Sequence, residues 1–209
     1  MKFIKKYIFI CSLFVLLPQT IISEGMHMPR SEVMKVLYKA YLKAQKEHLT
    51  DSPIVTLVDY SLPSNQPRLW VMDMRNQTVL QHTTVAHGKH SGQSITTSFS
   101  NREGSLKSSL GVFLTGETYQ GKHGKSMRLK GLEKGFNDNA EKRGIVVHGA
   151  KYVHRHCNDP SGMCNGRSFG CPAVSEKEVK AIIQKTQSGS LWLSYYPDQN
   201  WLQNSDFLV

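Results

Sequence analysis

The sequence predicts a mainly β domain of the α+β class, with a few helices at the periphery of the sheet. From residue 53 onward, short runs rich in β-branched and aromatic residues alternate with turns rich in Gly, Pro, Asn and Ser, a pattern typical of strands. Only two stretches show the 3.6-residue spacing of apolar side chains that favours an amphipathic helix. The chain shows no internal repeat and no heptad pattern, and its length suits one domain.

Residues 1–23 are predicted to be a secretory signal peptide. Lys2, Lys5 and Lys6 precede an apolar run of about eleven residues, and Pro18 and small polar residues follow it. That run is too short to cross a bilayer comfortably, although an uncleaved anchor is the alternative. We therefore expect export to the periplasm or cell envelope, with no stable membrane span after cleavage.

The chain is basic, with a formal net charge of +10 at pH 7. Loss of the three signal-peptide lysines leaves about +7, and such a surface suits a polyanionic partner. In a cell envelope that partner is a wall polymer or an anionic lipid, while export argues against nucleic acid. A generally solvated basic surface is the alternative.

The expected order of elements begins with an N-terminal helical segment, residues 24–50, which contains one helix over about 32–47 with Ser31 as its N-cap. The apolar stripe of this helix consists of Val33, Leu37, Tyr41 and Ala44. Strands are expected over residues 53–60, 68–74, 78–88, 111–119, 126–132, 144–150 and 189–197. Residues 91–110 form a long loop rich in Ser, Thr and Gly, and such a loop is usually functional or disordered.

A second helix is expected over residues 175–186, and a short helix or turn over 135–143. Ser175 and Glu178 have the spacing of a capping box, and Val179, Ile182 and Ile183 form the apolar stripe. We expect the main domain to span residues 51–198, followed by a C-terminal tail over 199–209.

Three cysteines remain after signal cleavage, and an odd number in an oxidising compartment leaves one thiol unpaired or pairs it between molecules. Cys157 and Cys164 flank the turn-prone segment "NDPSGM", so we expect them to form a disulfide. Cys171, in "GRSFGCPAV", is then the free thiol.

A nucleophilic cysteine needs a base, a group that orients the base, and donors for the developing oxyanion. His148 ends the apolar strand "GIVVH", where its ring would be held rigidly, and Gly149 allows close approach to the backbone. The Gly170–Cys171 turn could direct its amides at one point. On spacing alone, this cysteine and histidine are weak support for catalysis.

The segments "IVVHGAKYV" and "GRSFGCPAV" resemble the signature of the YkuD-type L,D-transpeptidase catalytic domain, in which a strand-borne His-Gly precedes a Ser-x-Gly-Cys turn. The resemblance covers roughly residues 54–197. It implies a β-sandwich catalytic domain that is exported and acts on peptidoglycan stem peptides. It also implies Cys171 as nucleophile, His148 as general base, the Gly149 carbonyl as the group orienting the imidazole, and the Gly170 and Cys171 amides as the oxyanion hole. Ser168, in the same turn, is a further candidate catalytic residue.

The sequence departs from the family pattern around the turn. The common form is Ser-His-Gly-Cys followed shortly by Arg or Asn, whereas here Phe169 follows Ser168, and Pro172 and Ala173 follow the cysteine. This leaves the acceptor side and the contact with the substrate carboxylate open. Arg167 is our candidate for the missing basic group, with a surface salt bridge as the alternative.

Other candidate residues carry weaker signals. By resemblance, Tyr119, His123 and Arg128 line the substrate groove, although exposed loop positions are the alternative. A possible zinc ligand set consists of His154, His156, Cys157 and Cys164. Its spacing fits no zinc motif known to us, and oxidised cysteines cannot bind as thiolates, so we expect no metal and no other cofactor.

The expected function is therefore cysteine-dependent acyl transfer on peptidoglycan stem peptides, with an acceptor envelope protein as a possible second partner. An L,D-carboxypeptidase acting on the same substrate is one alternative. A catalytically silent wall-binding domain and a zinc-dependent envelope hydrolase are the others.

Overall fold

The computed structural model describes residues 27–153, 168–187 and 189–209, and it confirms the mainly β class with peripheral helices. The strands are β1 (Ile54–Asp59), β2 (Leu69–Asp73), β3 (Thr78–Thr83), β4 (Gly111–Gly121), β5 (Gly124–Gly131), β6 (Val146–Gly149), β7 (Ala173–Val174) and β8 (Leu191–Tyr195). The helices are α1 (Ser31–Lys46), α2 (Val179–Thr186) and α3 (Gln199–Asn204). In these ranges no helix combines the length and apolarity needed to cross a bilayer.

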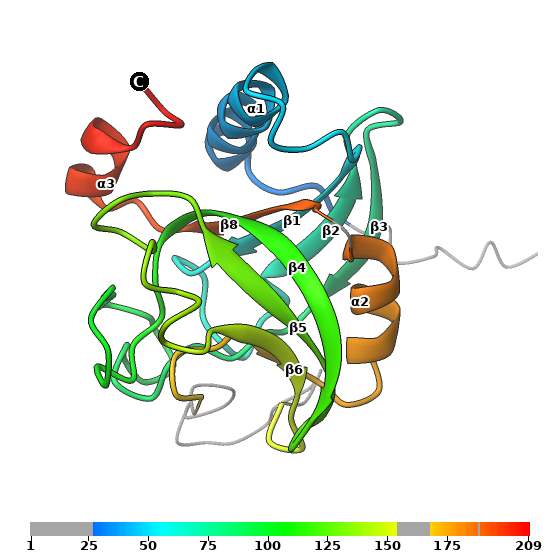
Figure 1. Cartoon of the computed structure of the whole chain (residues 1–209), viewed down its shortest axis with the longest axis vertical. Helices are drawn as coiled ribbons and strands as arrows, with labels where there is room; N and C mark the ends of the chain where they lie inside the picture. The colour runs from blue at the N-terminus through cyan, green and yellow to red at the C-terminus, as the bar shows by residue number, and fades with distance from the viewer. Residues whose placement is uncertain (1–26, 154–167, 188) are drawn as a thin grey trace, which may run out of the picture.

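The strands form one mixed sheet in the order β3-β2-β1-β8-β4-β5-β6-β7. The β1–β8 and β6–β7 pairs are parallel and the others antiparallel. Strand β4 curves strongly across the molecule, and its register with β5 shifts between Thr115 and Thr118, where a bulge increases the bend (Figure 1). The curl brings the sheet close to a barrel and leaves β6 and β7 at one end of it.

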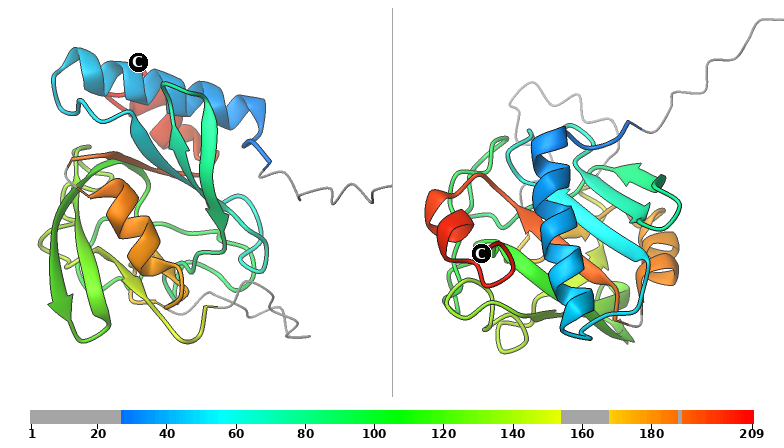
Figure 2. Two further views of the ribbon diagram at one scale, coloured as in Figure 1. Left: turned by 90° about the vertical axis from the view of Figure 1, so that its right-hand side faces the viewer. Right: turned by 90° about the horizontal axis from the view of Figure 1, so that it is seen from above.

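The two main helices cover opposite faces of this sheet (Figure 2). Side chains alternate along β1, so that Val55 and Leu57 pack with α1, while Val58 packs with α2 on the other face. The predicted stripes of both helices are confirmed, because every one of their members is buried: Val33, Leu37, Tyr41 and Ala44 in α1, and Val179, Ile182 and Ile183 in α2.

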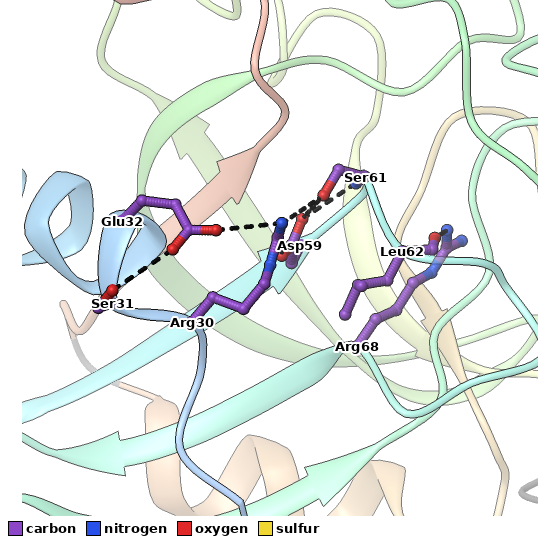
Figure 3. A network of polar contacts seen from close by, with 7 residues as sticks. All are labelled: Arg30, Ser31, Glu32, Asp59, Ser61, Leu62 and Arg68. Carbon is purple, nitrogen blue, oxygen red and sulfur yellow. Dashed lines mark hydrogen bonds and ion pairs between the residues drawn. The ribbon is translucent and has the colours of Figure 1, made fainter.

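The predicted N-cap of α1 is wrong by one residue, because Arg30 is the N-cap and Ser31 is already helical. Arg30 is held by the end of β1, where its Nη2 lies 2.8 Å from Asp59 Oδ2 and 2.7 Å from Ser61 Oγ (Figure 3). The Asp59 side chain is almost fully buried, so this ion pair fixes where the helix starts. The Ser31 hydroxyl turns to Glu32 instead of to the helix N-terminus.

The predicted capping box of α2 is also wrong, since the helix begins at Val179 and its N-cap is Glu178. The Ser175 hydroxyl donates to Glu178 Oε2 over 3.3 Å, and the Thr83 hydroxyl of β3 donates to the same oxygen over 2.5 Å. The carboxylate is therefore bonded to a distant strand and does not reach back to its own helix terminus.

The residues expected as a C-terminal tail, 199–209, contain α3 and pack against the core on the α1 side. Trp201 is fully buried, and its indole N–H donates to Glu133 Oε1 over 3.1 Å. The Ser205 hydroxyl and the Val112 amide also donate to this buried carboxylate. Burial raises the pKa of Glu133, although these hydrogen bonds act in the opposite direction.

Candidate active site

His148 lies at the end of β6, a strand of four residues that are all buried. Its Nδ1 is 2.9 Å from the carbonyl oxygen of Gly149, so this nitrogen carries the proton and donates it. The other ring nitrogen, Nε2, is then the basic one. This places the Gly149 carbonyl where the resemblance implies an orienting group.

The electrostatic surroundings keep the imidazole neutral near pH 7. Burial lowers the pKa of His148 below its ordinary value of 6.5, and the nearby His123 lowers it further. The hydrogen bond to the Gly149 carbonyl acts in the opposite direction. A neutral, oriented imidazole is what a general base requires.

Gly149 lies where α2 and the turn before it approach β6 closely. A Cβ on this residue would lie 3.1 Å from the Val179 side chain and 3.3 Å from the Glu176 backbone. The glycine therefore lets the start of α2 pack against the strand that carries His148.

The turn before β7 is fixed by backbone contacts. Ser168 is buried, its N–H donates to the His87 carbonyl over 3.1 Å, and its own carbonyl accepts from Lys89 N over 2.8 Å. Gly170 has a φ of +122° and a Cβ there would lie 2.7 Å from the Lys107 carbonyl oxygen, so only glycine fits. The Gly170 N–H donates to the Ser168 hydroxyl over 3.2 Å, so this amide must exchange that acceptor before it can bind an oxyanion.

Cys171 is a free, half-buried cysteine. Its sulfur accepts a hydrogen bond from the Val146 amide at 3.5 Å and donates to the Gly144 carbonyl at 3.6 Å. Burial raises the pKa of the Cys171 thiol, while the Val146 amide and the positive charge of Arg143 oppose the rise. In this state the thiol is protonated near pH 7, so a reaction of the thiolate would need a proton acceptor.

Cys171 lies two residues before β7, the strand that pairs in parallel with the strand of His148. His148 is opposite Ala173, and the hydrogen bond from the Val146 amide to the sulfur places Cys171 beside the residue two positions before the histidine. The sulfur's hydrogen bonds within the described residues run to the β6 backbone and its preceding turn, not to the imidazole.

The three residues expected to line the groove lie on the same side of the sheet as His148. Arg128 is opposite Val146, which alternation places on the His148 face, and Tyr119 lies on the strand beyond. The Arg128 guanidinium is 5.0 Å from the Tyr119 ring centre and also pairs with Glu117. His123, in the β4–β5 turn, has its ring 4.6 Å from that of His148. Of the three, His123 therefore reaches the histidine.

A hollow of about 570 Å³ opens beside His123 and Gly149. Its described lining includes His123, Gly149, Lys151, Tyr152 and Glu176. Burial raises the pKa of Tyr152 to about 12, and the nearby Cys171 adds to the rise. Sequence reasoning missed Tyr152, although it stands in the segment "IVVHGAKYV" four residues after His148.

Arg143 is the second residue that sequence reasoning missed. It precedes the strand that carries His148, and nothing in its local sequence indicates that its guanidinium lies beside the cysteine turn.

Phe169, which stands where the family has histidine, is 69% exposed, and Lys89 Nζ lies 4.6 Å from its ring centre.

Several predicted residues lie outside the described residues: Arg167, Cys157, Cys164, His154 and His156. The disulfide, the carboxylate contact and the zinc alternative therefore stay predictions. Within residues 27–153, 168–187 and 189–209, no group of three His, Cys, Asp or Glu side chains is arranged to hold a metal ion.

Comparison with protein families finds one match over most of the chain. The YkuD_2 family model, the L,D-transpeptidase catalytic domain, matches residues 26–195. A search of curated proteins finds no match.

Solved structures of low sequence identity were also found. An L,D-transpeptidase from Mycobacterium smegmatis is 12% identical, with a TM-score of 0.44, over 69% of this chain and 59% of that one. The helical cell shape determining protein Pgp2 from Campylobacter jejuni, solved as a mutant, is 14% identical, with a TM-score of 0.46, over 82% of this chain and 58% of that one. An L,D-transpeptidase from Stackebrandtia nassauensis is 12% identical, with a TM-score of 0.41, over 81% of this chain and 69% of that one. The match thus spans under two thirds of the mycobacterial and Campylobacter structures.

Proposed function

The chain belongs to the L,D-transpeptidase catalytic domain family, and on this premise we propose that it is an exported enzyme that performs cysteine-dependent acyl transfer on peptidoglycan stem peptides. The observation that carries the proposal is the pairing of two features within the matched region. A free cysteine stands on a turn beside β6, and the buried histidine of that strand is oriented by the Gly149 carbonyl.

The proposed reaction has two steps. Cys171 Sγ attacks the carbonyl of the third stem-peptide residue, the thiol proton passes to His148 Nε2, and the proton then goes to the leaving amine as the terminal D-alanine departs. In the second step the amine of another stem attacks the thioester and gives a proton to His148. The thiolate leaves and takes that proton back, and the new amide bond is the 3→3 cross-link. Tyr119, His123 and Arg128 are proposed to contact the peptide, and Arg167 its carboxylate.

The acceptor determines the product. Water in place of the amine would make the protein an L,D-carboxypeptidase, and a lysine of an envelope protein would make it an anchoring enzyme. The exposed Phe169, in place of the family histidine, is the observation that favours a silent wall-binding domain as the second candidate.

Incubation of the mature protein with purified disaccharide-tetrapeptide, followed by mass analysis of the products, tests the proposal. We expect a cross-linked dimer minus one D-alanine per bond formed. Tripeptide without dimer would identify the carboxypeptidase. If no product forms, and a carbapenem adds no mass to the protein, the silent binding domain replaces the enzyme, because acylation requires a reactive thiolate. Metal analysis of the same sample tests the zinc alternative.

The pairing of the cysteines gives a separate prediction. Export supplies an oxidising compartment, and we expect Cys157 and Cys164 to form a disulfide that closes a loop of about eight residues, a stabilisation of roughly 2.5 kcal/mol in the chain-entropy model. Thiol counting under denaturing conditions without reductant should give one free sulfhydryl per chain, which peptide mass assigns to Cys171. Three free thiols, or a disulfide that includes Cys171, would contradict the prediction, and three thiols would also favour the zinc alternative.

A further inference from the structure

The Arg143 guanidinium lies directly against the turn that carries Cys171. Its Nη2 is 3.2 Å from the point where a Cβ on Gly170 would stand. The same nitrogen donates to the Lys107 carbonyl over 2.5 Å, and that carbonyl is also the nearest atom to the missing Gly170 Cβ, at 2.7 Å. Arg143 thus contacts both the long loop and the cysteine turn at one point.

The other hydrogen bonds of the Arg143 guanidinium bind further residues of the loop at residues 91–110. Nη1 donates to the Ser100 carbonyl over 2.6 Å and to the Ser109 hydroxyl, and Nη2 donates to the Ser105 hydroxyl over 3.3 Å. This organises part of the loop at residues 91–110, whose role the sequence left open between function and disorder. The loop is folded against the cysteine turn.

Arg143 carries a charge without a counterion in the described part of the chain. All its acceptors there are neutral carbonyl or hydroxyl oxygens, and no carboxylate pairs with it. Arg143 is half-buried, partial burial of a cation among neutral partners is costly, and this burial lowers the pKa of Arg143. A thiolate at Cys171 would supply the missing negative charge.

We propose that Arg143 is a positioning residue for the nucleophile: it holds the Gly170–Cys171 turn against the loop, and its charge favours the thiolate form of Cys171. The catalytic purpose of this arrangement rests on the proposed function, whereas the experiment that tests it does not. The neutral thiol donates to the Gly144 carbonyl, a contact that is lost on ionisation. The Val146 amide and Arg143 remain to stabilise the anion.

Other titratable groups also surround the sulfur. His148 lies on β6, Tyr152 follows β6, and Tyr60 follows β1, with His123 behind His148. The two tyrosines are neutral near pH 7, because burial raises the pKa of each. Among these groups, Arg143 is therefore the fixed positive charge, and His148 becomes positive only when it takes a proton.

The test is the pH dependence of iodoacetamide alkylation, followed by mass analysis of the Cys171 peptide without reductant. Arg143→Gln should raise the midpoint by about one pH unit or more and slow alkylation near pH 7 by about tenfold, since an opposite charge at close range shifts a pKa by this amount. Arg143→Lys, which keeps the charge, should stay close to the wild-type midpoint. Lys142→Gln is the matched control, because this exposed neighbour pairs only with Glu103 among the described residues.

Melting curves decide which variants are compared. Arg143→Met is a second neutral variant in case Arg143→Gln does not fold, and any folded neutral variant with the wild-type midpoint would overturn the proposal. The proposal would also be overturned if the midpoint of Arg143→Lys moved as far as that of the neutral variant, because charge would then not be the cause. If neither neutral variant folds, Arg143→Lys decides alone: an unchanged midpoint supports the proposal, and a rise of about one unit overturns it. Alkylation needs no peptidoglycan, so the outcome is independent of whether the substrate proposal holds.

Discussion

Cys171→Ala is expected to abolish both thioester formation and turnover of the tetrapeptide. Cys171 is the residue proposed to form the acyl intermediate, and an alanine side chain has no nucleophilic atom that could replace its sulfur. The fold should survive, because a half-buried thiol with two long hydrogen bonds is replaced by a smaller apolar group. A cost of about 1 kcal/mol would lower the melting temperature by only about 2–4 °C in a domain of this size.

The measurement is intact mass after incubation with tetrapeptide or a carbapenem, with turnover followed in parallel. Cys171→Ser is the matched variant: it keeps the shape and a hydroxyl, but a serine hydroxyl would need far stronger activation than one histidine supplies. We expect no adduct and no turnover in either variant at unchanged melting behaviour. Wild-type turnover in Cys171→Ala would end the covalent mechanism.

Local periodicity predicted α1, α2 and most strands, because an element that buries one face carries the apolar stripe in its own residues, whereas α3 lies in residues expected to be a tail. The stripes of α1 and α2 are the clearest cases, since all their predicted members are buried. The β1–β8 pairing could not be predicted in this way. It joins Val55 to Leu191 in parallel, and no local signal links residues so far apart.

Side chains that make tertiary contacts explain the wrong boundaries. The strand expected over residues 78–88 ends at Thr83, because the buried Arg68 guanidinium takes the Val85 carbonyl through Nε and Nη2. Arg68 also donates to the His87 ring over 2.7 Å, and burial together with this cation lowers the pKa of His87 to about 4. Figure 3 shows Arg68 beside Leu62, whose carbonyl it also binds. The predicted caps of α1 and α2 were wrong for the same kind of reason, because tertiary contacts bind the side chains concerned.

Part of the candidate site could likewise be predicted from local sequence, and part depends on tertiary contacts. His148, Gly149, Gly170 and Cys171 stand in short motifs, and the sheet places both motifs on neighbouring strands. Arg143 lies beside the cysteine only because the loop and the turn meet, and the Gly170 amide is engaged by Ser168 for a reason of local turn geometry. The motifs identified the candidate reacting groups, whereas the tertiary fold determines which other side chains lie around them.

His148→Ala is expected to lower the rate of acylation by roughly 10²–10⁴-fold, the usual contribution of a positioned base. Alkylation of Cys171 near neutral pH should slow in parallel, because the proton acceptor is lost and burial keeps the thiol protonated. In the wild type the base must be unprotonated, and the pKa of His148 lies below 6.5. Activity should therefore be retained at pH 7 and fall as the pH drops through that lowered value.

The acid limb of this profile is the sharpest readout, since a merely structural histidine would not produce it. His148→Gln keeps a donor in reach of the Gly149 carbonyl but has no basic nitrogen, so it should lose both the rate and the acid limb while folding normally. His48→Asn is the control, because this exposed histidine follows α1 with a φ of 56°, a conformation that asparagine tolerates. If acylation and alkylation proceed in His148→Ala at the rates of His48→Asn, His148 is a structural residue at a strand end and the base lies elsewhere.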